Sequence, residues 1–260
     1  MTHMCLITFN KEANSPYPFV LIANRDESYH RESKAIHFWE DEPNIIGGRD
    51  MKAGGTWLAM TKTGRFAALT NQPFTNHEPV ELTSRGELIS NFLKGEMTAI
   101  EYAKELRTNR LNYDGYNLLF GTLDDLYLYD NVSDALTPLS DGIHSVSNTK
   151  DDLSKYRQTQ SESDLTQMLE ANQAPSVDQM IKSFQDKTPN PDFKHYPEHL
   201  DKEYARQSSS IFLSGNQEFG TVSTTAIVVD KEGKVQMKEV RYSPKEITQV
   251  TEETFQLESE

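Results

Sequence analysis

Runs of hydrophobic residues divide the start of the chain into two short strand-like segments. Residues 5–9 and 19–23 are rich in β-branched and aromatic side chains, whereas residues 10–18 contain asparagine, serine and two prolines. This pattern predicts a β-hairpin. If Phe9 faces residue 19 or 20, antiparallel pairing carries the first residue of one strand to within one or two positions of the last residue of the other.

The rest of the chain contains groups of strand-like segments and groups of helix-like segments. The expected strands are 56–61, 65–70, 116–121, 126–129, 142–147, 209–213, 221–229 and 235–241, and the expected helices are 83–94, 98–106, 152–172 and 176–185. The apolar faces of the first two helices carry Leu88, Ile89, Phe92 and Leu93, then Ile100, Tyr102, Ala103 and Leu106. Residues 189–202, with three prolines, are expected to form a connecting loop. Grouped strands and helices favour a layered α+β sandwich over alternating βαβ units.

Length and hydropathy are typical of one globular domain. The chain has 260 residues, of which 36% are hydrophobic, and its longest apolar runs have only the length of a strand. We therefore expect a single domain over residues 1–260 and no integral membrane segment. Residues 1–8 lack the basic and apolar regions of a secretory signal, so a cytoplasmic location is expected.

Charge and cysteine content narrow the classes of partner. The chain has 40 acidic and 26 basic residues, and the resulting net charge of −14 repels the phosphates of nucleic acids and of anionic membranes. No nucleic acid is expected as a partner, and the acidic residues near 252–260 are expected to form a loose tail. The single cysteine excludes an internal disulfide, and no Cys or His pair has zinc-ligand spacing, so no metal site is expected.

The tetrapeptide Asn24-Arg25-Asp26-Glu27 stands at the end of the second strand, about twenty residues after the only cysteine, Cys5. The hairpin therefore places a guanidinium and two carboxylates near the thiol. The guanidinium would favour the thiolate, and a carboxylate would orient a nearby ammonium group, as an activated sulfur nucleophile requires. On the tetrapeptide alone, a surface ion pair that closes the hairpin is the simpler interpretation.

An ordered series of short motifs resembles the NRDE family, also called the transport and Golgi organization family. The motifs, which follow one another along nearly the whole chain, are Met4-Cys5-Leu6-Ile7, Asn24-Arg25-Asp26-Glu27, His37-Phe38-Trp39-Glu40-Asp41, Gly47-Gly48-Arg49-Asp50, Gly54-Gly55-Thr56-Trp57-Leu58, Gly64-Arg65-Phe66-Ala67-Ala68-Leu69-Thr70-Asn71, Ser84-Arg85-Gly86-Glu87-Leu88, Ser145-Val146-Ser147-Asn148, Ser209-Ser210-Ile211-Phe212 and Phe219-Gly220-Thr221-Val222-Ser223-Thr224-Thr225. The resemblance implies a fold like that of N-terminal-nucleophile hydrolases. That fold is a four-layer αββα sandwich, in which two antiparallel sheets lie between two helical layers.

In such hydrolases the first residue supplies both the nucleophile and the base, because an α-amine titrates near pH ~8. Cys5 would have to become the first residue, as it would if translation began at Met4 and Met4 were removed. In the chain that begins at Met1 the free amine is on the wrong residue. A solitary cysteine is otherwise most often a small buried hydrophobe, so a catalytic and a structural role both stay open.

Other site residues follow from the resemblance. Similarity to the bile-salt-hydrolase and penicillin-acylase branch of the superfamily implies that Arg25 and Asp26 flank the thiol and that Asn71 and Asn148 form an oxyanion hole. Turn formation is the alternative role for either asparagine. In that branch the spacing of Arg and Asp differs from the adjacent pair in this chain.

The candidate substrate-binding residues are Asn24, Glu27, Arg49, Trp57 and Arg85. For Trp57 a place in the core is the simpler interpretation, whereas the two arginines form either a charged rim with Asp50 or solvated ion pairs. The family commonly places an arginine where this chain has Val222, which weakens the argument for an anionic substrate held at that point.

Two classes of function remain. The first is a cysteine hydrolase that cleaves a nonpeptide C–N amide bond of a small molecule and requires no cofactor. The second is a non-catalytic carrier or chaperone that uses the same pocket for haem or for acyl-CoA or another lipid, since the resemblance associates relatives with such ligands. His30, His37 and His144 are then candidate axial ligands of haem. Neither the ligand nor the oligomeric state follows from the sequence.

Overall fold

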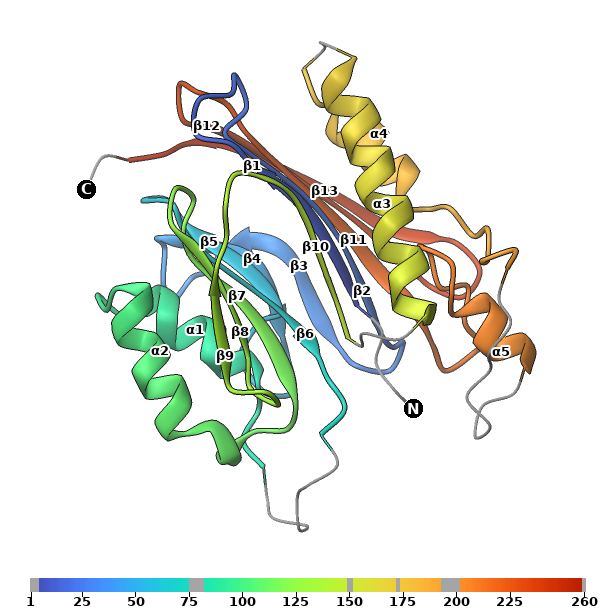
Figure 1. Cartoon of the computed structure of the whole chain (residues 1–260), viewed down its shortest axis with the longest axis horizontal. Coiled ribbons are helices and arrows are strands. Elements are labelled where there is room, and N and C mark those ends of the chain that lie inside the picture. Colours follow the sequence, from blue (N-terminus) through green and yellow to red (C-terminus); the bar gives the residue numbers. More distant parts are fainter. Residues whose placement is uncertain (1–4, 75–81, 149–151, 172–173, 193–201, 259–260) are drawn as a thin grey trace.

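The computed structural model describes residues 5–74, 82–148, 152–171, 174–192 and 202–258 of the chain. Two antiparallel sheets face each other, and helices cover their outer faces (Figure 1). Sheet 1 has six strands in the spatial order β10 (Gly142–Ser147), β1 (Leu6–Lys11), β2 (Phe19–Ser28), β11 (Phe219–Val229), β12 (Lys234–Tyr242) and β13 (Ile247–Gln256). Sheet 2 has seven strands in the order β3 (Ser33–Phe38), β4 (Ile45–Asp50), β5 (Leu58–Thr61), β6 (Arg65–Asn71), β7 (Tyr116–Thr122), β8 (Leu126–Asp130) and β9 (Ala135–Pro138).

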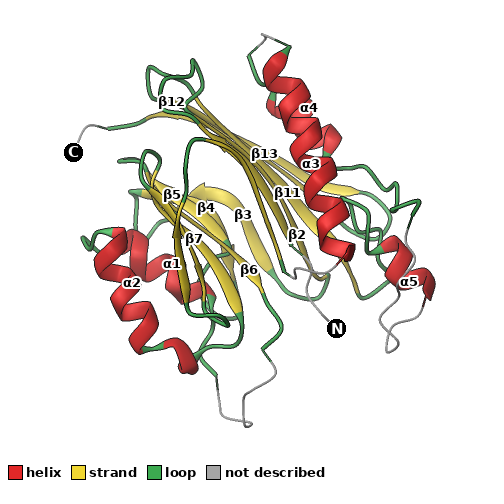
Figure 2. Ribbon diagram, viewed as in Figure 1, coloured by secondary structure: helices red, strands yellow, loops and turns green. Residues whose placement is uncertain are grey.

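Helices form the two outer layers. The helical segments are α1 (Gly86–Lys94), α2 (Ala99–Thr108), the short 3₁₀ turn η1 (Arg110–Asn112), α3 (Asp152–Glu170), α4 (Val177–Ser183) and α5 (Lys202–Gln207). Figure 2 shows α1 and α2 on the outer side of sheet 2, and α3 and α4 on the outer side of sheet 1. The four-layer αββα sandwich is therefore confirmed. No helix in the described ranges is long and apolar enough to cross a membrane.

Alternation along the strands divides most of the buried side chains among three cores, with a small fourth cluster of Leu213 and Phe219. The central core, between the sheets, contains Phe9, Leu21 and Phe66. A second core joins sheet 2 to α1 and α2, and a third, which includes Leu6 from β1, joins sheet 1 to α3 and α4. Because β1 buries both faces, it reads as a continuous apolar run rather than an alternating one.

The N-terminal hairpin is confirmed, with a register shifted by one or two positions from the expected one. Phe9 pairs with Leu21, and Leu6 pairs with Asn24. Cys5, the next residue back along the chain, therefore stands beside the end of β2 where the charged tetrapeptide begins. The hairpin thus brings the thiol to the tetrapeptide, as expected.

Several other expectations are corrected. Residues 209–213 do not form a strand, because Ser209 and Ser210 donate their hydroxyl protons to the carbonyl oxygens of Arg206 and Gln207, and such local bonds compete with sheet pairing. Ile100 is 45% exposed and does not lie on the apolar face of α2. The strands β3, β4, β9 and β13 were not expected from the sequence.

The acidic C-terminal segment forms a strand where a loose tail was expected. Residues 252–256 belong to β13, which pairs with β12 from Tyr242 opposite Ile247 to Lys234 opposite Gln256. They are therefore not a loose tail. Most of the expected loop at 189–202 lies outside the described residues.

The segment between β4 and β5 packs against the start of α1 through two glycines. A Cβ atom on Gly55 would lie 2.5 Å from the carbonyl carbon of Gly86, and Thr56 N donates a hydrogen bond to Gly86 O at 3.3 Å. Both partners are backbone, so neither can turn aside as a flexible side chain would. This contact fixes the position of α1 relative to sheet 2.

We expect Gly55→Ala to lower the free energy of unfolding by about 1–3 kcal/mol, since the new methyl group forces the two backbones apart. Gly54→Asn is the matched control. Gly54 has φ 74° with open space around its Cβ position, and asparagine tolerates that conformation. Urea unfolding of both variants measures the difference, and equal losses would contradict the proposed contact.

Candidate functional site

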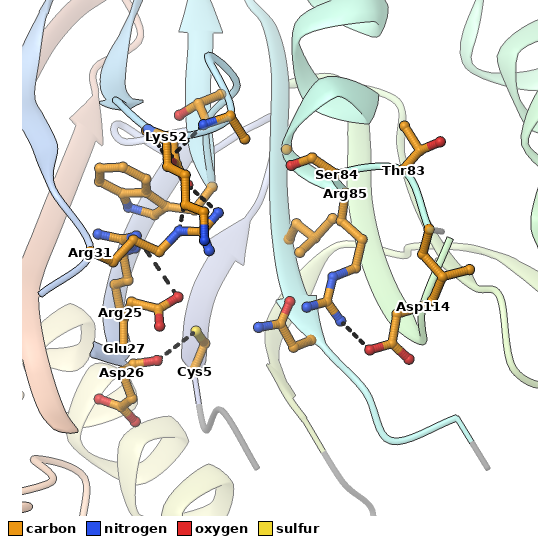
Figure 3. Close-up of a pocket in the computed structure, with 18 residues that line it drawn as sticks. Cys5, Arg25, Asp26, Glu27, Arg31, Lys52, Thr83, Ser84, Arg85 and Asp114 are labelled. Atoms are coloured by element: carbon orange, nitrogen blue, oxygen red, sulfur yellow. Dashed lines mark hydrogen bonds and ion pairs between the residues drawn. The ribbon is translucent and has the colours of Figure 1, made fainter. Parts of the chain in front are cut away.

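A cleft of about 720 Å³ opens where the end of β2 faces the first turn of α1 (Figure 3). Cys5 lies on its floor, with the sulfur 4.0 Å from the main-chain oxygen of Asp26. Asn71 lies at the end of β6 and also lines the cleft. The residues on its walls that carry charge or chemistry are Arg25, Glu27, Arg31, Asp50, Lys52, Trp57, Ser84, Arg85 and Asp114.

The two-residue period of β2 sends successive side chains of the tetrapeptide to opposite faces of sheet 1. Arg25 and Glu27 face the cleft. Asn24 faces the helical layer instead, where its amide donates hydrogen bonds to the carbonyl oxygens of Phe184 and Ile211 at 2.9 and 3.0 Å. It is 1% exposed, so its described contacts are structural rather than directed at a substrate.

Three contacts hold the Arg25 guanidinium beside the thiol. It lies 4.1 Å from the centre of the Trp57 ring, donates a hydrogen bond to Ser33 Oγ at 3.2 Å, and stands 4.0 Å from a Glu27 carboxylate oxygen. Trp57 therefore both packs against the central core and orients a cation on the cleft wall. The placement of Arg25 next to Cys5 agrees with the sequence-based expectation.

The Asp26 carboxylate points away from the thiol, as Figure 3 shows, and forms a buried ion pair with Arg157 of α3 at 2.9 Å. Its other oxygen accepts a hydrogen bond from Thr221 Oγ1 at 2.6 Å. Arg157 also donates to Ile211 O at 2.9 Å. Asp26 therefore lies next to Cys5, as expected, but the group that contacts the sulfur is its main-chain carbonyl and not its carboxylate.

Of the two asparagines expected at an oxyanion hole, Asn71 is the last residue of β6 in sheet 2, and Asn148 directly follows β10 of sheet 1. Asn71 borders the cleft, whereas Asn148 is 2% exposed and is not among the described residues that line it. Ser147, which precedes Asn148, has its carbonyl oxygen bonded across the gap between sheets by Asn117 Nδ2 at 3.1 Å and by Thr70 Oγ1 at 3.4 Å. These bonds fix the backbone next to both asparagines.

The remaining candidates separate into one residue at the cleft and one away from it. Arg85 lines the cleft and donates a hydrogen bond to Gly115 O at 2.8 Å. Arg49 lies 4.2 Å from the centre of the Trp39 ring and forms a two-bond ion pair with Asp41. Arg49 is not among the described residues that line the cleft, so the predicted rim consists of Arg85 and Asp50 without it.

Sequence reasoning missed four charged residues at or behind the cleft: Arg31, Lys52, Asp114 and Arg157. Arg31 and Lys52 flank the pairing of β3 with β4, and those two strands were not expected, so no signal connected them with the thiol. Arg157 stands in the second turn of a polar helix whose sequence shows no sign of a buried ion pair.

The environment of Cys5 favours the protonated thiol when the residue is inside the chain. Burial raises its pKa to about 12, the negative charge of Asp26 adds to that effect, and the Asp26 main-chain contact and the Arg25 charge only partly oppose it. The expected activation by Arg25 is therefore present but outweighed. Another source of positive charge at Cys5 would be needed to form a thiolate at neutral pH.

Behind Arg25, a buried carboxyl joins the two sheets. Glu239 of β12 is fully buried and accepts a hydrogen bond from the main-chain nitrogen of Ile36 of β3 at 3.3 Å. Burial raises the pKa of Glu239 to about 7, while Arg241, the Ile36 N–H, Arg25 and Thr225 oppose the shift. The folded protein thus binds a proton on Glu239 that the unfolded chain releases near pH 4.5.

This shift predicts a loss of stability as pH rises from about 4.5 through 7, since a raised pKa stabilises the folded state only while the group is protonated. We expect Glu239→Gln to remove this pH dependence. Between pH 5 and 8 the free energy of unfolding of the wild type should then fall by about 2 kcal/mol more than that of the variant. Urea unfolding at both pH values measures the difference. Parallel slopes for the two proteins would contradict a raised pKa.

We expect Asp26→Asn to lower the free energy of unfolding by about 3–5 kcal/mol, because it leaves the Arg157 guanidinium buried without its counterion. Asp178→Asn is the control, as Asp178 pairs with Lys238 at the surface and should contribute less than about 1 kcal/mol. Adding Arg157→Leu to Asp26→Asn should recover part of the loss. A loss below that of the control would show that the ion pair does not stabilise the fold.

The layers and the position of the thiol define a class of protein, namely one with the fold of N-terminal-nucleophile hydrolases. Two solved structures of a conjugated bile acid hydrolase from Clostridium perfringens are similar over the whole chain. One superposes with a TM-score of 0.53 and covers 98% of each chain, and the other with 0.50, covering 97% of this chain and 96% of that one. Sequence identity is 9% in both cases, so the similarity concerns the fold alone.

The chain belongs to the Transport and Golgi organisation 2 family, whose family model matches residues 4–244. The resemblance seen in the motifs is therefore confirmed. A Transport and Golgi organization 2 homolog from Mus musculus is 39% identical over 127 residues, which are 46% of each protein, so that match spans about half of either chain. The homolog from Homo sapiens is 29% identical over 282 residues, covering 97% of this chain and 98% of the human protein.

Proposed function

We propose that this protein is an amidohydrolase in which Cys5 acts as an N-terminal nucleophile on a nonpeptide C–N amide of a small molecule. The observation that carries the proposal is the position of the only cysteine. It stands directly before β1, an inner strand of sheet 1, and lines the 720 Å³ cleft together with Arg25 and Asn71. That volume lies in the range typical of small-molecule sites. A hydrolase with the same fold supports this class of reaction by analogy.

The chemistry requires that the residues before Cys5 be removed. Removal creates an α-amine at the floor of the cleft, next to the thiol, with an ordinary pKa near ~8. The protonated amine would add the positive charge that Arg25 alone does not supply, and would lower the pKa of the thiol. The free amine and the thiol then share one proton, as nucleophile and base must.

The proposed reaction has two steps. The thiolate sulfur attacks the amide carbonyl carbon, a C–S bond forms, and the electron pair moves to the carbonyl oxygen, which the Asn71 amide would stabilise. When that pair returns, the C–N bond breaks and the leaving amine takes the proton from the Cys5 ammonium group. Water then attacks the thioester, which releases a carboxylic acid and restores the thiol.

We expect a chain that starts at Cys5 to hydrolyse a simple N-acyl amide, while Cys5→Ala abolishes turnover, because that variant keeps the α-amine but lacks the sulfur. The measurement is release of free amine from a panel of N-acyl amides, with the chain that starts at Met1 as the matched control. Equal rates for the two starts would show that the α-amine takes no part in the reaction.

One observation favours a second candidate function, a carrier that no longer catalyses. With Cys5 inside the chain its pKa is raised to about 12, so the thiol is protonated and the cleft can bind a ligand without attacking it. Haem and acyl-CoA are the candidate cargoes. The described histidines bond elsewhere, His30 to Glu218, His37 to Ala35 O and His144 to Ser140 O, and none of the three lines the cleft. Axial ligation of haem by these residues in this cleft therefore lacks support.

Titration of the chain that starts at Met1 with haem and with a long-chain acyl-CoA separates the two functions. Saturable binding of either ligand, together with no turnover by the chain that starts at Cys5, favours the carrier. Turnover by the chain that starts at Cys5 favours the hydrolase.

A further inference from the structure

The cleft concentrates positive charge in a protein that is otherwise strongly acidic. The whole chain has a net charge of −14, yet four cationic side chains line this one cleft, namely Arg25, Arg31, Lys52 and Arg85. Three carboxylates accompany them, from Glu27, Asp50 and Asp114, while the Asp26 carboxylate is turned away to Arg157. A positive surplus inside a cleft raises the local concentration of anionic ligands.

Each arginine already has a carboxylate neighbour. Arg31 pairs with Asp50 at 2.7 Å, Arg85 stands 3.6 Å from Asp114, and Arg25 stands 4.0 Å from Glu27. In the described part of the chain, by contrast, no carboxylate lies within ion-pair distance of Lys52. The surplus charge of the cleft therefore resides on Lys52.

Lys52 extends from a turn that Asp50 makes rigid. One Asp50 oxygen accepts hydrogen bonds from the main-chain nitrogens of Lys52 and Ala53 at 2.9 and 3.1 Å, and the other accepts from Arg31 Nε at 2.7 Å. One Asp50 oxygen is thus occupied by the turn and the other by Arg31. Asp50 holds the base of Lys52 next to the Arg31 guanidinium, and the two cations share one wall of the cleft (Figure 3).

The opposite wall carries the third element of the site. Arg85 immediately precedes α1, no side chain caps the start of that helix, and Ser84, Arg85 and Gly86 all line the cleft. The main-chain N–H groups of Glu87 and Leu88 are bonded to Ser84 O and Arg85 O, so the Arg85 guanidinium is the cationic group that this wall contributes. The Arg85 side chain is held by Gly115 O, so its position does not depend on a ligand.

We propose that the ligand of this cleft bears an anionic group, a carboxylate, sulfonate or phosphate, which binds between Lys52 and Arg31 on one wall and Arg85 on the other. The inference rests on the proposed function only in placing the ligand's amide carbonyl at Cys5, on the floor between the walls. The anion is held by these residues and not at Val222, which lies at the irregular pairing of β11 with β2 and does not line the cleft.

Binding to the Cys5→Ala variant tests the proposal without any need for turnover. The probes are N-octanoylglycine, N-octanoyltaurine and O-phospho-N-octanoylethanolamine, with N-octanoylethanolamine as the neutral analogue, and calorimetry measures each dissociation constant. We expect at least one anionic probe to bind about tenfold more tightly than the neutral analogue. The tightest of the three identifies the anion. That preference should weaken as salt concentration rises.

The deciding variant is Lys52→Gln, added to Cys5→Ala. It should weaken binding of the preferred anionic probe about fivefold and leave the neutral analogue within about twofold, since one exposed ion pair contributes up to about 1 kcal/mol. Lys104→Gln is the matched control, because it removes the same charge from an exposed position on α2. Both lysines are exposed, so neither change should impair folding.

The proposal is overturned if the neutral analogue binds as tightly as all three anionic probes, or if Lys52→Gln and Lys104→Gln weaken binding equally. Failure of the hydrolase proposal gives a different result. An anionic probe that binds through Lys52 but is not cleaved by the chain that starts at Cys5 supports the anion site and removes the reaction. Cleavage of the neutral analogue without any preference for anions supports the hydrolase and removes the anion site.

Discussion

The buried ion pair between Asp26 and Arg157 is the interaction on which the arrangement of the site depends. It joins the end of β2 to the second turn of α3, and both side chains are at most 1% exposed. Desolvation of two such charges is costly, and hydrogen bonds from Thr221 Oγ1 to Asp26 and from Arg157 to the Ile211 carbonyl offset part of that cost. With the carboxylate fixed on the helical side, the Asp26 carbonyl is fixed on the side where it meets the Cys5 sulfur.

The alternation of β2 gives the tetrapeptide two roles at once. Asn24 and Asp26 attach sheet 1 to the helical layer, whereas Arg25 and Glu27 form part of the cleft wall. A substitution in the first pair acts through folding, and one in the second acts through the site. Measurements of activity on these residues therefore need a parallel measurement of stability.

The charges and the burial around Cys5 act on the pKa of its thiol in opposite directions. Burial and the Asp26 charge raise the pKa of Cys5 further than Arg25 lowers it, so the protonated thiol is favoured while the residue lies inside the chain. A protonated α-amine on Cys5 would lower the pKa of the adjacent thiol. On the proposed function, the cleft binds its ligand in either form of the chain, and attack on the ligand requires the form that starts at Cys5.

The sequence by itself predicted the layered sandwich and the position of Cys5 near the charged tetrapeptide. The strand pattern predicted the hairpin of β1 and β2, and antiparallel pairing placed Cys5 near the tetrapeptide to within the one or two positions by which the register differs. Only the tertiary structure placed Arg157 and Lys52, which come to the site from a helix and a turn with no local sign of that position. It also turned Asn24 away from the cleft and Arg49 toward Asp41, since the face on which a side chain lies depends on which layer packs there. Local pattern determines pairing between neighbouring strands, whereas contacts between layers depend on packing over long sequence separations.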